Sequence, residues 1–514
     1  MSLNMVSRGL KVAKVAIHAN RLRKSTTEEK KRIARIALAG QFADARGSLM
    51  KVGQLLSADQ DDSFDTLLKG ISPLPLDEII PAIEFSLGQS VDNVFDSIAE
   101  SNHAASLGQV HQATLKNGQQ VAVKVRYPDI VKLVEAEIKI FGLMPGLGPV
   151  KKWGMDLESY KQAFKSNMDR ELDYCEESKT QQLFRKELTI PGLCIPAVYP
   201  ESSCSGLIVQ SWESGQYLDE ISGWPIKDKK KLGEILLTTL FKSLFELGVV
   251  HGDPHVGNYY FRRDKSQRPE VVMMDFGCKI EITKNRRLAL LNLILAISEE
   301  RSVIPIRNFA SMGFEVTKLA KIGESLPMLS QILFKPFMQP GLFHISHWEI
   351  ESRVERLLGE KKWWFRSAGP SDLFLLLRAF QGIVQQLQML KVSLPWLEIL
   401  HRSLDPEIIQ NARLMLLPAI KQEQQIKVSD VRCLASALCI KVSSDGKEKV
   451  SARVPAELAL DLENLMPSEV LDILRKDNEV DLVLIQRNIA DSGVAPQAVF
   501  HHEIGIKKYE IWLE

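Results

Sequence analysis

Three side chains in the middle of the chain have the types and spacing of a metal-assisted phosphoryl-transfer site. Asp253 and Asn258 lie five residues apart in HGDPHVGN, and Asp275 opens an Asp-Phe-Gly seventeen residues after Asn258. Asn258 and Asp275 offer hard oxygen ligands for Mg²⁺, and Asp253 can accept the proton of an attacking hydroxyl. Either motif alone is weak, because an isolated Asp-Phe-Gly is common and the first motif could be a polar loop. Their order, with the apolar run Val271–Met274 between them, favours a kinase-type site.

An upstream hairpin supplies the cation that such a site needs. We expect strands over Val110–Leu115 and Gln120–Arg126, because an Asn-Gly pair between them is a strong hairpin turn signal. The second strand contains VAVK, which is typical of the kinase strand whose Lys binds nucleotide phosphates, here Lys124. The preceding loop, HAASLGQ, has small residues that let backbone N–H groups approach phosphates. These residues are Ala104, Ala105, Ser106 and Gly108.

Lys124 needs a carboxylate that keeps it charged and oriented, and two candidates follow it. Glu137 is expected on the helix after the hairpin, and Glu177 on a later helix containing RELDYCEES. On that later helix Glu171 and Asp173 are two residues apart, and Asp173 and Glu177 share a face because they are four apart. If buried, these acids need cationic partners; on the surface they would form a solvated stripe.

The composition limits the class of protein. The chain has 514 residues, is 45% hydrophobic and 25% charged, and carries a net charge of +1, so no global field steers it to nucleic acid. Its six cysteines form no C-x-x-C pair, which favours reduced thiols. No run of 18 apolar residues and no secretory signal occur, so we expect a cytoplasmic protein.

Residues 1–39 form a basic segment with ten Lys and Arg against two Glu. On a helical wheel the basic residues and the apolar Val6, Leu10, Ala13 and Ile17 fall on different sides. A basic amphipathic helix suits peripheral contact with a membrane that carries anionic lipid. A helix that packs its apolar stripe on the protein itself, and an organelle transit peptide, are the alternatives.

Two further segments surround the hairpin. In GSLMKVGQLLSADQDD, Lys51 and Gln54 share one helix face. The Gly between them is explained either by close approach to another surface or by a surface helix with a chance Gly. A Pro-punctuated linker, SPLPLDEIIP, follows, and then a helix over Ile79–Leu87. Leu207–Gly215 reads as a strand that ends in a turn, where a kinase hinge would meet the adenine.

Together, and in this order, the motifs resemble the UbiB/AarF family of atypical kinase-like proteins. The elements that carry the resemblance are K-x-G-Q, the Ala-rich loop, the Lys of VAVK, E-x-D, HGDPHVGN and the Asp of DFG, over roughly residues 40–415. They correspond to Lys51, Gln54, Ala104, Ala105, Ser106, Lys124, Glu171, Asp173, Asp253, Asn258 and Asp275.

The resemblance implies an α+β, bilobed protein-kinase-like fold with a helical N-terminal extension over the active site. It implies binding of ATP or ADP with Mg²⁺, and a pairing of Lys124 with Glu177. It also implies that Lys51 and Gln54 act with Glu171 and Asp173 as a gate that excludes protein substrates. The family is linked to ubiquinone and other isoprenoid-lipid metabolism, with ATPase rather than protein kinase activity, so an isoprenoid or lipid ligand is expected.

The chain departs from the family pattern at several positions. His103 replaces the usual first Ala of the Ala-rich loop, Val256 replaces a Pro, and Ser211 stands at the hinge where an acid is common. The two membrane-spanning helices at the end of many bacterial members have no counterpart, which weakens a strict assignment to ubiquinone synthesis. After Asp275 the chain enters an apolar helix, Leu288–Ile297, with no long activation loop and no Ala-Pro-Glu, so no peptide-docking platform is expected.

The remainder reads as helices followed by a small accessory module. Asp372–Leu390 is amphipathic, with Leu373, Leu376, Leu377 and Phe380 expected on one face, more typical of a core than of a lipid site. Beyond residue 425 we expect strands in CIKVSS, KVSARVP, DLVLIQ and HHEIGIKKYEIWL, and helices over Ala456–Leu465 and Pro467–Lys476. The partner of this module is not indicated. The expected domains are 1–39, 40–100 with K-x-G-Q, 101–215 as the N-lobe, 216–424 as the helical C-lobe, and 425–514.

We therefore expect an atypical kinase or ATPase in which Lys124, Glu177 and Asp253 are catalytic. Gly108 and the Ala-rich loop would contact the nucleotide, and Asn258 and Asp275 would hold Mg²⁺. The alternative from another class is a nucleotide-sensing scaffold without turnover. A kinase that acts on a small polar molecule is a third possibility. Such a kinase shares the motif of Asp253 and Asn258 but should lack K-x-G-Q and E-x-D.

Overall fold

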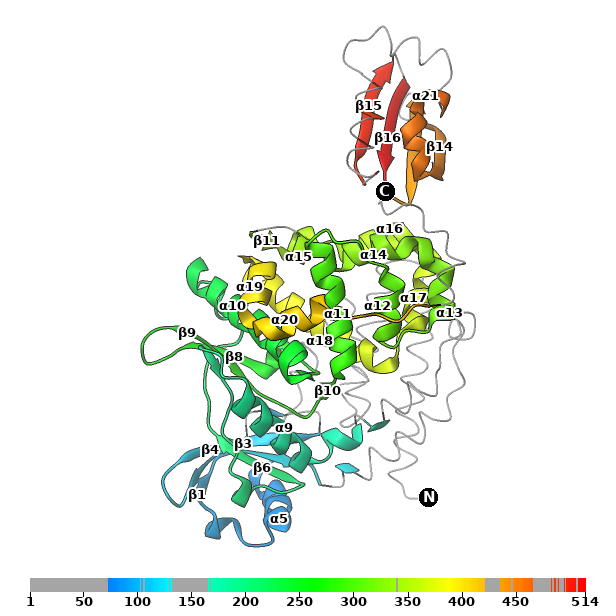
Figure 1. Cartoon of the computed structure of the whole chain (residues 1–514). Helices are drawn as coiled ribbons and strands as arrows, with labels where there is room; N and C mark the ends of the chain where they lie inside the picture. The colour runs from blue at the N-terminus through cyan, green and yellow to red at the C-terminus, as the bar shows by residue number, and fades with distance from the viewer. Residues whose placement is uncertain are drawn as a thin grey trace, which may run out of the picture. The chain divides into compact units, whose positions relative to one another are not determined.

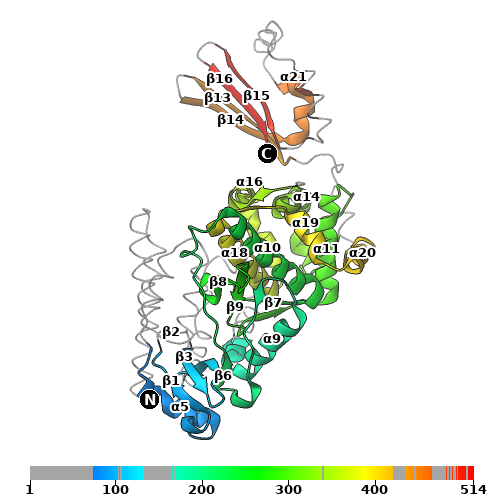
Figure 2. The ribbon, with the colours of Figure 1, turned by 90° about the vertical axis from the view of Figure 1, so that its left-hand side faces the viewer.

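The computed structural model describes most of the chain between residue 73 and the C-terminus. The described residues are 73–101, 103–104, 107–128, 130–131, 165–166, 168–338, 341–420, 435–444, 447–465, 482, 485–486, 489, 494, 496–504 and 507–514. Lys51, Gln54, Ala105, Ser106, Glu137 and the basic segment 1–39 lie outside them. Contacts group the described residues into two compact units, one within 1–282 and 371–392, the other within 283–370 and 393–514. Figures 1 and 2 show the helices and strands, coloured from blue at the N-terminus to red at the C-terminus.

The first unit contains an antiparallel sheet built around the predicted hairpin. The strand order is β1-β3-β4-β6, with β2 paired to β3. The hairpin prediction is confirmed: β3 and β4 pair directly, and Gly118 at their turn has a φ of 81°, which favours glycine. The strands are β1 (Phe95–Ile98), β2 (His103–Ala104), β3 (Gly108–Leu115), β4 (Gln120–Arg126) and β6 (Leu207–Ser211).

Helix α5 (Leu76–Leu87) packs on this sheet and corrects the expected linker. The segment SPLPLDEIIP was interpreted as a linker, but the helix begins at Leu76 and contains Pro81. Ile79 and Ile83, four residues apart, are fully buried in the core cluster of the sheet. Burial of these two side chains therefore outweighs the Pro, whose cost is a missing backbone hydrogen bond. A short 3₁₀ turn, η1 (Val91–Asn93), leads from α5 into β1.

The segment RELDYCEES is not one helix. Asp173 has extended backbone angles (φ −103°, ψ 95°) and caps α9 (Tyr174–Glu187), its carboxylate accepting a hydrogen bond from the N–H of Cys175. Glu171 belongs to the helical turn before the break. An Asp at this position competes for backbone N–H groups and so begins a helix rather than continuing one. Asp173 and Glu177 are therefore not partners on one helix face.

A small set of strands and helices in the first unit surrounds the predicted residues Asp253, Asn258 and Asp275 in the sequence. Strand β7 pairs with β10, and β8 pairs with β9, which pairs in parallel with β5. Helix α18 packs against α10, β7 and β10 although it lies about a hundred residues later in the chain. The elements are β5 (Leu193–Cys194), η2 (Pro200–Ser202), α10 (Ile226–Phe241), η3 (Lys242–Leu247), β7 (Val249–His251), η4 (Val256–Asn258), β8 (Tyr259–Arg263), β9 (Pro269–Met273), β10 (Lys279–Glu281) and α18 (Ser371–Leu390).

The buried face of α18 differs from the predicted one. Leu376, Ala379, Ile383 and Leu387 are buried, in steps of three and four residues, whereas Leu377 is 53% exposed. One residue step turns a helix by about 100°, so Leu376 and Leu377 cannot both face the core. The assignment of the stripe to a core is confirmed, but Leu377 was wrongly included in it.

The second unit is mainly helical before residue 420. Its first helix extends the predicted Leu288–Ile297 to Lys284–Ser298. A buried Asn of this helix, Asn292, accepts a hydrogen bond from the buried Asn308 of the next helix. Its elements are α11 (Lys284–Ser298), α12 (Pro305–Ser311), α13 (Val316–Leu319), η5 (Ala320–Ser325), α14 (Leu326–Leu333), α15 (Lys335–Met338), β11 (Phe343–His344), η6 (Ile345–His347), α16 (Ile350–Leu358), η7 (Gly359–Lys361), α17 (Lys362–Ala368), β12 (Ser393–Leu394), α19 (Trp396–Ser403) and α20 (Pro406–Arg413).

The C-terminal part of this unit contains a four-stranded antiparallel sheet in the order β14-β13-β16-β15. The predicted final strand is in fact two strands, β15 and β16, which pair with each other. In DLVLIQ the described residues Leu482, Ile485 and Gln486 are helical and not extended. Leu482, Ile485 and Ile489 recur at helical spacing, a signal that outweighs the β-branched composition. The elements are β13 (Ala437–Ser444), β14 (Lys447–Pro455), η9 (Ala456–Asp461), α21 (Leu462–Leu465), β15 (Ala498–Ile504) and β16 (Lys507–Leu513).

Two further findings concern the described residues as a whole. None of their helices combines the length and the apolar character needed to cross a bilayer. Their cysteines are free thiols.

The packing of α5 makes a direct prediction for stability. Ile83→Ala removes a fully buried side chain from the core cluster and should lower the free energy of unfolding by about 2–5 kcal/mol. Phe85→Ala on the same helix is the control: Phe85 is 89% exposed, so its truncation should change stability by less than about 0.5 kcal/mol. Urea denaturation of the two variants measures both values. Equal losses would contradict the described orientation of α5.

Candidate active site

The loop between β7 and β8 holds Asp253 and Asn258 in a fixed relation. Asn258 Nδ2 donates a hydrogen bond of 2.8 Å to the backbone carbonyl of Asp253. The backbone carbonyl of Asn258 in turn accepts from the N–H of Met274, 2.9 Å away, at the end of β9. Because the amide nitrogen is used in this way, the amide oxygen is the atom of Asn258 that can bind a metal ion.

Asp275 has an unusual backbone conformation that its neighbours maintain. Its φ is 57°, in the left-handed region that an Asp adopts only rarely. The backbone carbonyl of Asp275 accepts a hydrogen bond of 2.6 Å from Nε2 of His251. Burial lowers the pKa of His251, so the ring is neutral at pH 7 and carries its proton on Nε2. Such strain, of order 1–3 kcal/mol, occurs mainly at functional sites.

Lys124 forms a buried ion pair with Glu177. Its Nζ lies 2.7 Å from Oε1 and 3.0 Å from Oε2 of Glu177, and the side chains are 13% and 3% exposed. Asp275 Oδ1 is 3.4 Å from the same Nζ. Burial opposes the charge on Lys124, but the carboxylates of Asp275 and Glu177 outweigh it and raise the pKa of the ammonium group. The structure therefore brings three predicted site residues from three elements together.

Phe276 connects this ion pair to the loop. The ring is 1% exposed and contacts the rings of Phe184 on α9, at 5.4 Å, and His251, at 5.5 Å, between centroids. A backbone hydrogen bond from Phe276 also reaches the carboxylate of Glu177. Helix α9 and the segment of Asp275 are thus held together by one side chain and one peptide group.

Gly108 begins β3 where the predicted phosphate loop ends. A Cβ at this position would collide with the carbonyl oxygen of Val125 and would lie 2.8 Å from the hydroxyl of Tyr174. Tyr174 is buried, and its ring lies 5.2 Å from Lys124 Nζ and 5.9 Å from the guanidinium of Arg126. Gly108 is therefore required for close packing beside Lys124. Ala104 pairs with Gln109 in the β2–β3 ladder.

The two acids of E-x-D have different environments. Glu171 is 7% exposed, and its Cγ would lie 3.7 Å from a Cβ on Gly277. The same added atom would lie 3.4 Å from Oδ1 of Asp275 and 3.4 Å from Oε2 of Glu177. Gly277 thus leaves room for three carboxylates on one side of the site. Asp173 caps α9 instead, and its predicted partners Lys51 and Gln54 lie outside the described residues.

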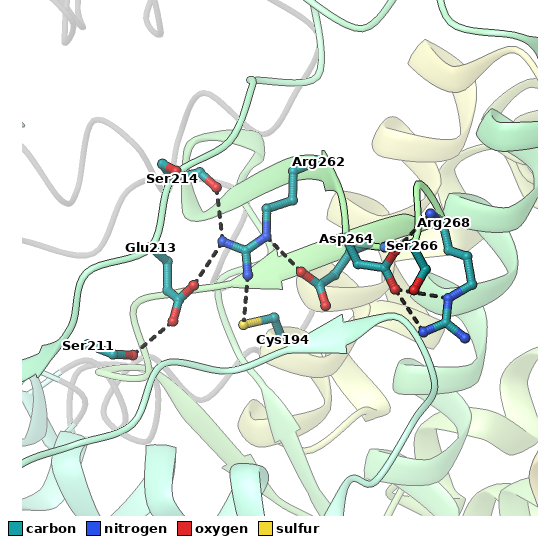
Figure 3. A network of polar contacts seen from close by, with 9 residues as sticks. Cys194, Ser211, Glu213, Ser214, Arg262, Asp264, Ser266 and Arg268 are labelled. Atoms are coloured by element: carbon teal, nitrogen blue, oxygen red, sulfur yellow. Dashed lines mark hydrogen bonds and ion pairs between the residues drawn. The ribbon is translucent and has the colours of Figure 1, made fainter.

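The predicted hinge is tied to the β8–β9 hairpin by Arg262 (Figure 3). Its Nη1 is 2.8 Å from Oε2 of Glu213 and 3.1 Å from the carbonyl of Ser214, and its Nε is 2.7 Å from Glu270. Ser211 Oγ donates to Glu213 Oε1 at 2.9 Å. An acidic side chain, Glu213, thus lies next to Ser211 and pairs with Arg262.

The sequence analysis missed Arg378, which contacts the predicted catalytic acid. Its Nη2 lies 3.3 Å from Asp253 Oδ1, and the two side chains are 13% and 15% exposed. Arg378 is the only charged residue in the run LFLLLRAF, on a helix expected to be core. That isolated charge was the available signal, because a buried Arg requires an anionic partner.

Comparisons with known proteins find relatives over part of the chain. Residues 66–303 match the family model of the ABC1 atypical kinase-like domain. The chain therefore contains an ABC1 atypical kinase-like domain, and its relatives include aarF domain-containing and COQ8 kinases of the UbiB family. With the mixed helices and strands described above, this confirms the expected kinase-like α+β fold.

Individual UbiB relatives are distant in sequence. An uncharacterized chloroplastic aarF domain-containing protein kinase of Arabidopsis thaliana is 26% identical and matches 68% of this chain. The mitochondrial atypical kinase COQ8B of Rattus norvegicus is 25% identical over 61% of this chain. The matches span 51% and 61% of these relatives' own lengths. A solved structure, the Rv3197–erythromycin complex from Mycobacterium tuberculosis, matches 72% of this chain and 95% of its own chain at 23% identity, with a TM-score of 0.49.

Gly108→Ala tests the close packing beside Lys124. The added methyl group has no room against Val125 and Tyr174, so the free energy of unfolding should fall by about 1–3 kcal/mol. Gly223→Ala is the control, because a Cβ there meets no atom within 4 Å. Its effect should stay within about 0.5 kcal/mol. Equal stability of the two variants in thermal unfolding would contradict this packing.

Glu177 makes stability depend on pH. Burial raises the pKa of its carboxyl to about 7 from the ordinary 4.5, although Lys124 acts in the opposite direction. The stabilising contribution of this group is therefore complete below pH 4.5 and is lost as the pH rises through about 7. The unfolding free energy of the wild type, relative to Glu177→Gln, should fall between pH 5 and pH 8. Urea denaturation at several pH values measures the difference; a rise with pH would mean that Lys124 outweighs burial.

Proposed function

We propose that this protein binds ATP or ADP with Mg²⁺ and acts as an atypical kinase or ATPase rather than as a protein kinase. One observation supports this above all. Lys124 Nζ lies 3.4 Å from Asp275 Oδ1 while its ion pair with Glu177 keeps it oriented. A phosphate-binding cation next to a metal-binding carboxylate is the arrangement that phosphates and their Mg²⁺ require.

The donor groups fit Mg²⁺. The side chain of Asp275 is 42% exposed, so solvent and ligands can reach it. Asn258 uses its amide nitrogen on the carbonyl of Asp253, which leaves the amide oxygen for a metal. Both are hard oxygen donors, and Mg²⁺ in kinases is bound by few protein oxygens together with phosphate oxygens. When bound, the ion would neutralise charge on the phosphates.

The other predicted residues receive the following roles in this proposal. Lys124 orients the phosphates, which Gly108 and the Ala-rich loop would also contact. Asp253 positions or deprotonates the acceptor, which is water or a hydroxyl. Lys51 and Gln54 gate the site together with Glu171 and Asp173; the burial of Glu171 beside Gly277 supports an inward-facing role for that acid.

The short segment after Asp275 supports a substrate that is not a protein. Between Gly277 and Lys284, the first residue of α11, the chain forms only β10. Protein kinases use a longer segment in this place to dock peptides. We infer a small molecule, a lipid or water as the acceptor.

We further propose a role in ubiquinone or other isoprenoid-lipid metabolism, with peripheral membrane contact through residues 1–39. The support is the ABC1 atypical kinase-like domain and the charge of that segment, ten Lys and Arg against two Glu. Two similar proteins are named as mitochondrial and chloroplastic. Anionic lipid attracts such basic segments by roughly 1 kcal/mol per cation near the surface.

Phosphate release from Mg²⁺-ATP by the purified chain tests the enzymatic proposal. Asp253→Asn should lower kcat about 10²–10⁴-fold, because the acceptor loses its orienting acid. Asp275→Asn should abolish the thermal stabilisation by Mg²⁺-ADP, because the metal loses its carboxylate. Asp92→Asn, on an exposed 3₁₀ turn, is the control and should retain both properties.

The outcomes separate an enzyme from a nucleotide-sensing scaffold. Stabilisation by Mg²⁺-ADP without phosphate release in the wild type would indicate a scaffold. Stabilisation that survives in Asp275→Asn would show that the metal assignment is wrong.

A further inference from the structure

One face of α18 supports the loop that carries Asp253. Arg378, Gly382 and Gln386 follow each other at intervals of four residues and therefore share a face. Gln386, which is fully buried, donates from Nε2 to the carbonyl of Pro254 at 3.0 Å. A Cβ on Gly382 would lie 2.7 Å from Cγ and 2.9 Å from O of Pro254, so only a glycine lets the helix approach this closely.

Arg378 makes a different kind of contact from the other two. Gly382 and Gln386 meet the ring and the backbone carbonyl of Pro254 and so contact the loop without any charged group. Arg378 instead reaches the carboxylate of Asp253, with Nη2 3.3 Å from Oδ1. Both side chains are more than four-fifths buried, and burying a charge is costly unless it is paired. Support of the loop alone does not require the burial of two charged side chains.

The chemistry of the proposed reaction gives this contact a purpose. Phosphoryl transfer depends mainly on positioning and on electrostatic stabilisation, because its transition state is loose and demands little proton removal at the start. An acid that only orients the acceptor needs a defined rotamer more than it needs strong basicity. An ion pair to a residue on a packed helix supplies such a rotamer.

We propose that Arg378 is a positioning residue for Asp253, fixing the orientation of the carboxylate toward the acceptor during turnover. This inference rests on the proposed function. Arg378 acts through Asp253 and has no contact with the Lys124–Glu177 pair among the described residues. Its loss should therefore slow turnover and leave nucleotide binding intact.

Steady-state phosphate release and nucleotide binding are measured on the full chain for Arg378→Met, Arg378→Gln and Arg378→Lys. The two neutral variants should lower kcat about 10–100-fold, the usual cost of a misplaced catalytic group. KM for Mg²⁺-ATP and the thermal shift with Mg²⁺-ADP should stay within about twofold of the wild type, because those depend on other residues. Arg378→Lys keeps the charge and should recover part of the lost rate.

Two controls separate positioning from general damage. Arg268→Met makes the same substitution on a side chain that is 77% exposed in the β8–β9 turn, and it should behave as the wild type. Arg378→Gln keeps a hydrogen-bonding head group and serves as the neutral variant if Arg378→Met does not fold. Gln386→Leu removes the hydrogen bond to Pro254 and retains the charge of Arg378 next to Asp253. It therefore measures the effect of losing loop support alone, for comparison with the neutral variants at position 378.

Each result has one meaning. Neutral variants that turn over at the wild-type rate would overturn the role of Arg378 alone. Equal losses in kcat and in nucleotide affinity, or no recovery with Lys, would show that Arg378 only stabilises the fold. A wild type that binds Mg²⁺-ADP without releasing phosphate would overturn the proposed function itself, and with it the inference.

Discussion

The buried ion pair between Lys124 and Glu177 is the interaction on which the candidate site depends. It joins a strand of the sheet to the first turns of α9 across 53 residues of sequence. An unpaired charge at either position would be expensive, because both side chains are largely removed from water. The pair therefore specifies how α9 lies on the sheet, and Asp275 is then brought to Lys124 through Phe276, which packs on the same helix.

Further hydrogen bonds hold the segment of Asp275 and the loop of Asp253. His251 holds the carbonyl of Asp275 in its strained conformation, and Asn258 holds the carbonyl of Asp253. Helix α18 also contacts the loop, through Arg378 and Gln386. The site is thus held together by polar contacts and by the ring packing of Phe276. Such support from neighbouring groups is what keeps catalytic side chains within a productive geometry.

Local patterns in the sequence predicted the parts of this site that depend on nearby residues. The Asn-Gly turn predicted the β3–β4 hairpin, and the order of Lys124, Asp253, Asn258 and Asp275 predicted a kinase-like fold, which the family match confirms. The roles of these residues remain predictions. Helix boundaries at Asp173 and Leu76 were wrong, because a capping carboxylate and two buried Ile side chains outweighed simple spacing. Arg378 was missed because its partner lies 125 residues earlier, beyond any local pattern.

That separation affects how the protein is made. The loop of Asp253 and the segment of Asp275 leave the ribosome well before α18, with the α11–α17 region synthesised in between. At roughly 5–20 residues per second, about a hundred residues correspond to several seconds of synthesis. During this interval the nascent chain contains Lys124 and Glu177 but not the helix whose Arg378 contacts Asp253. The Lys124–Glu177 pair is therefore synthesised before α18, and a chain that ends before residue 371 would lack the contacts of Arg378 and Gln386 with the loop of Asp253.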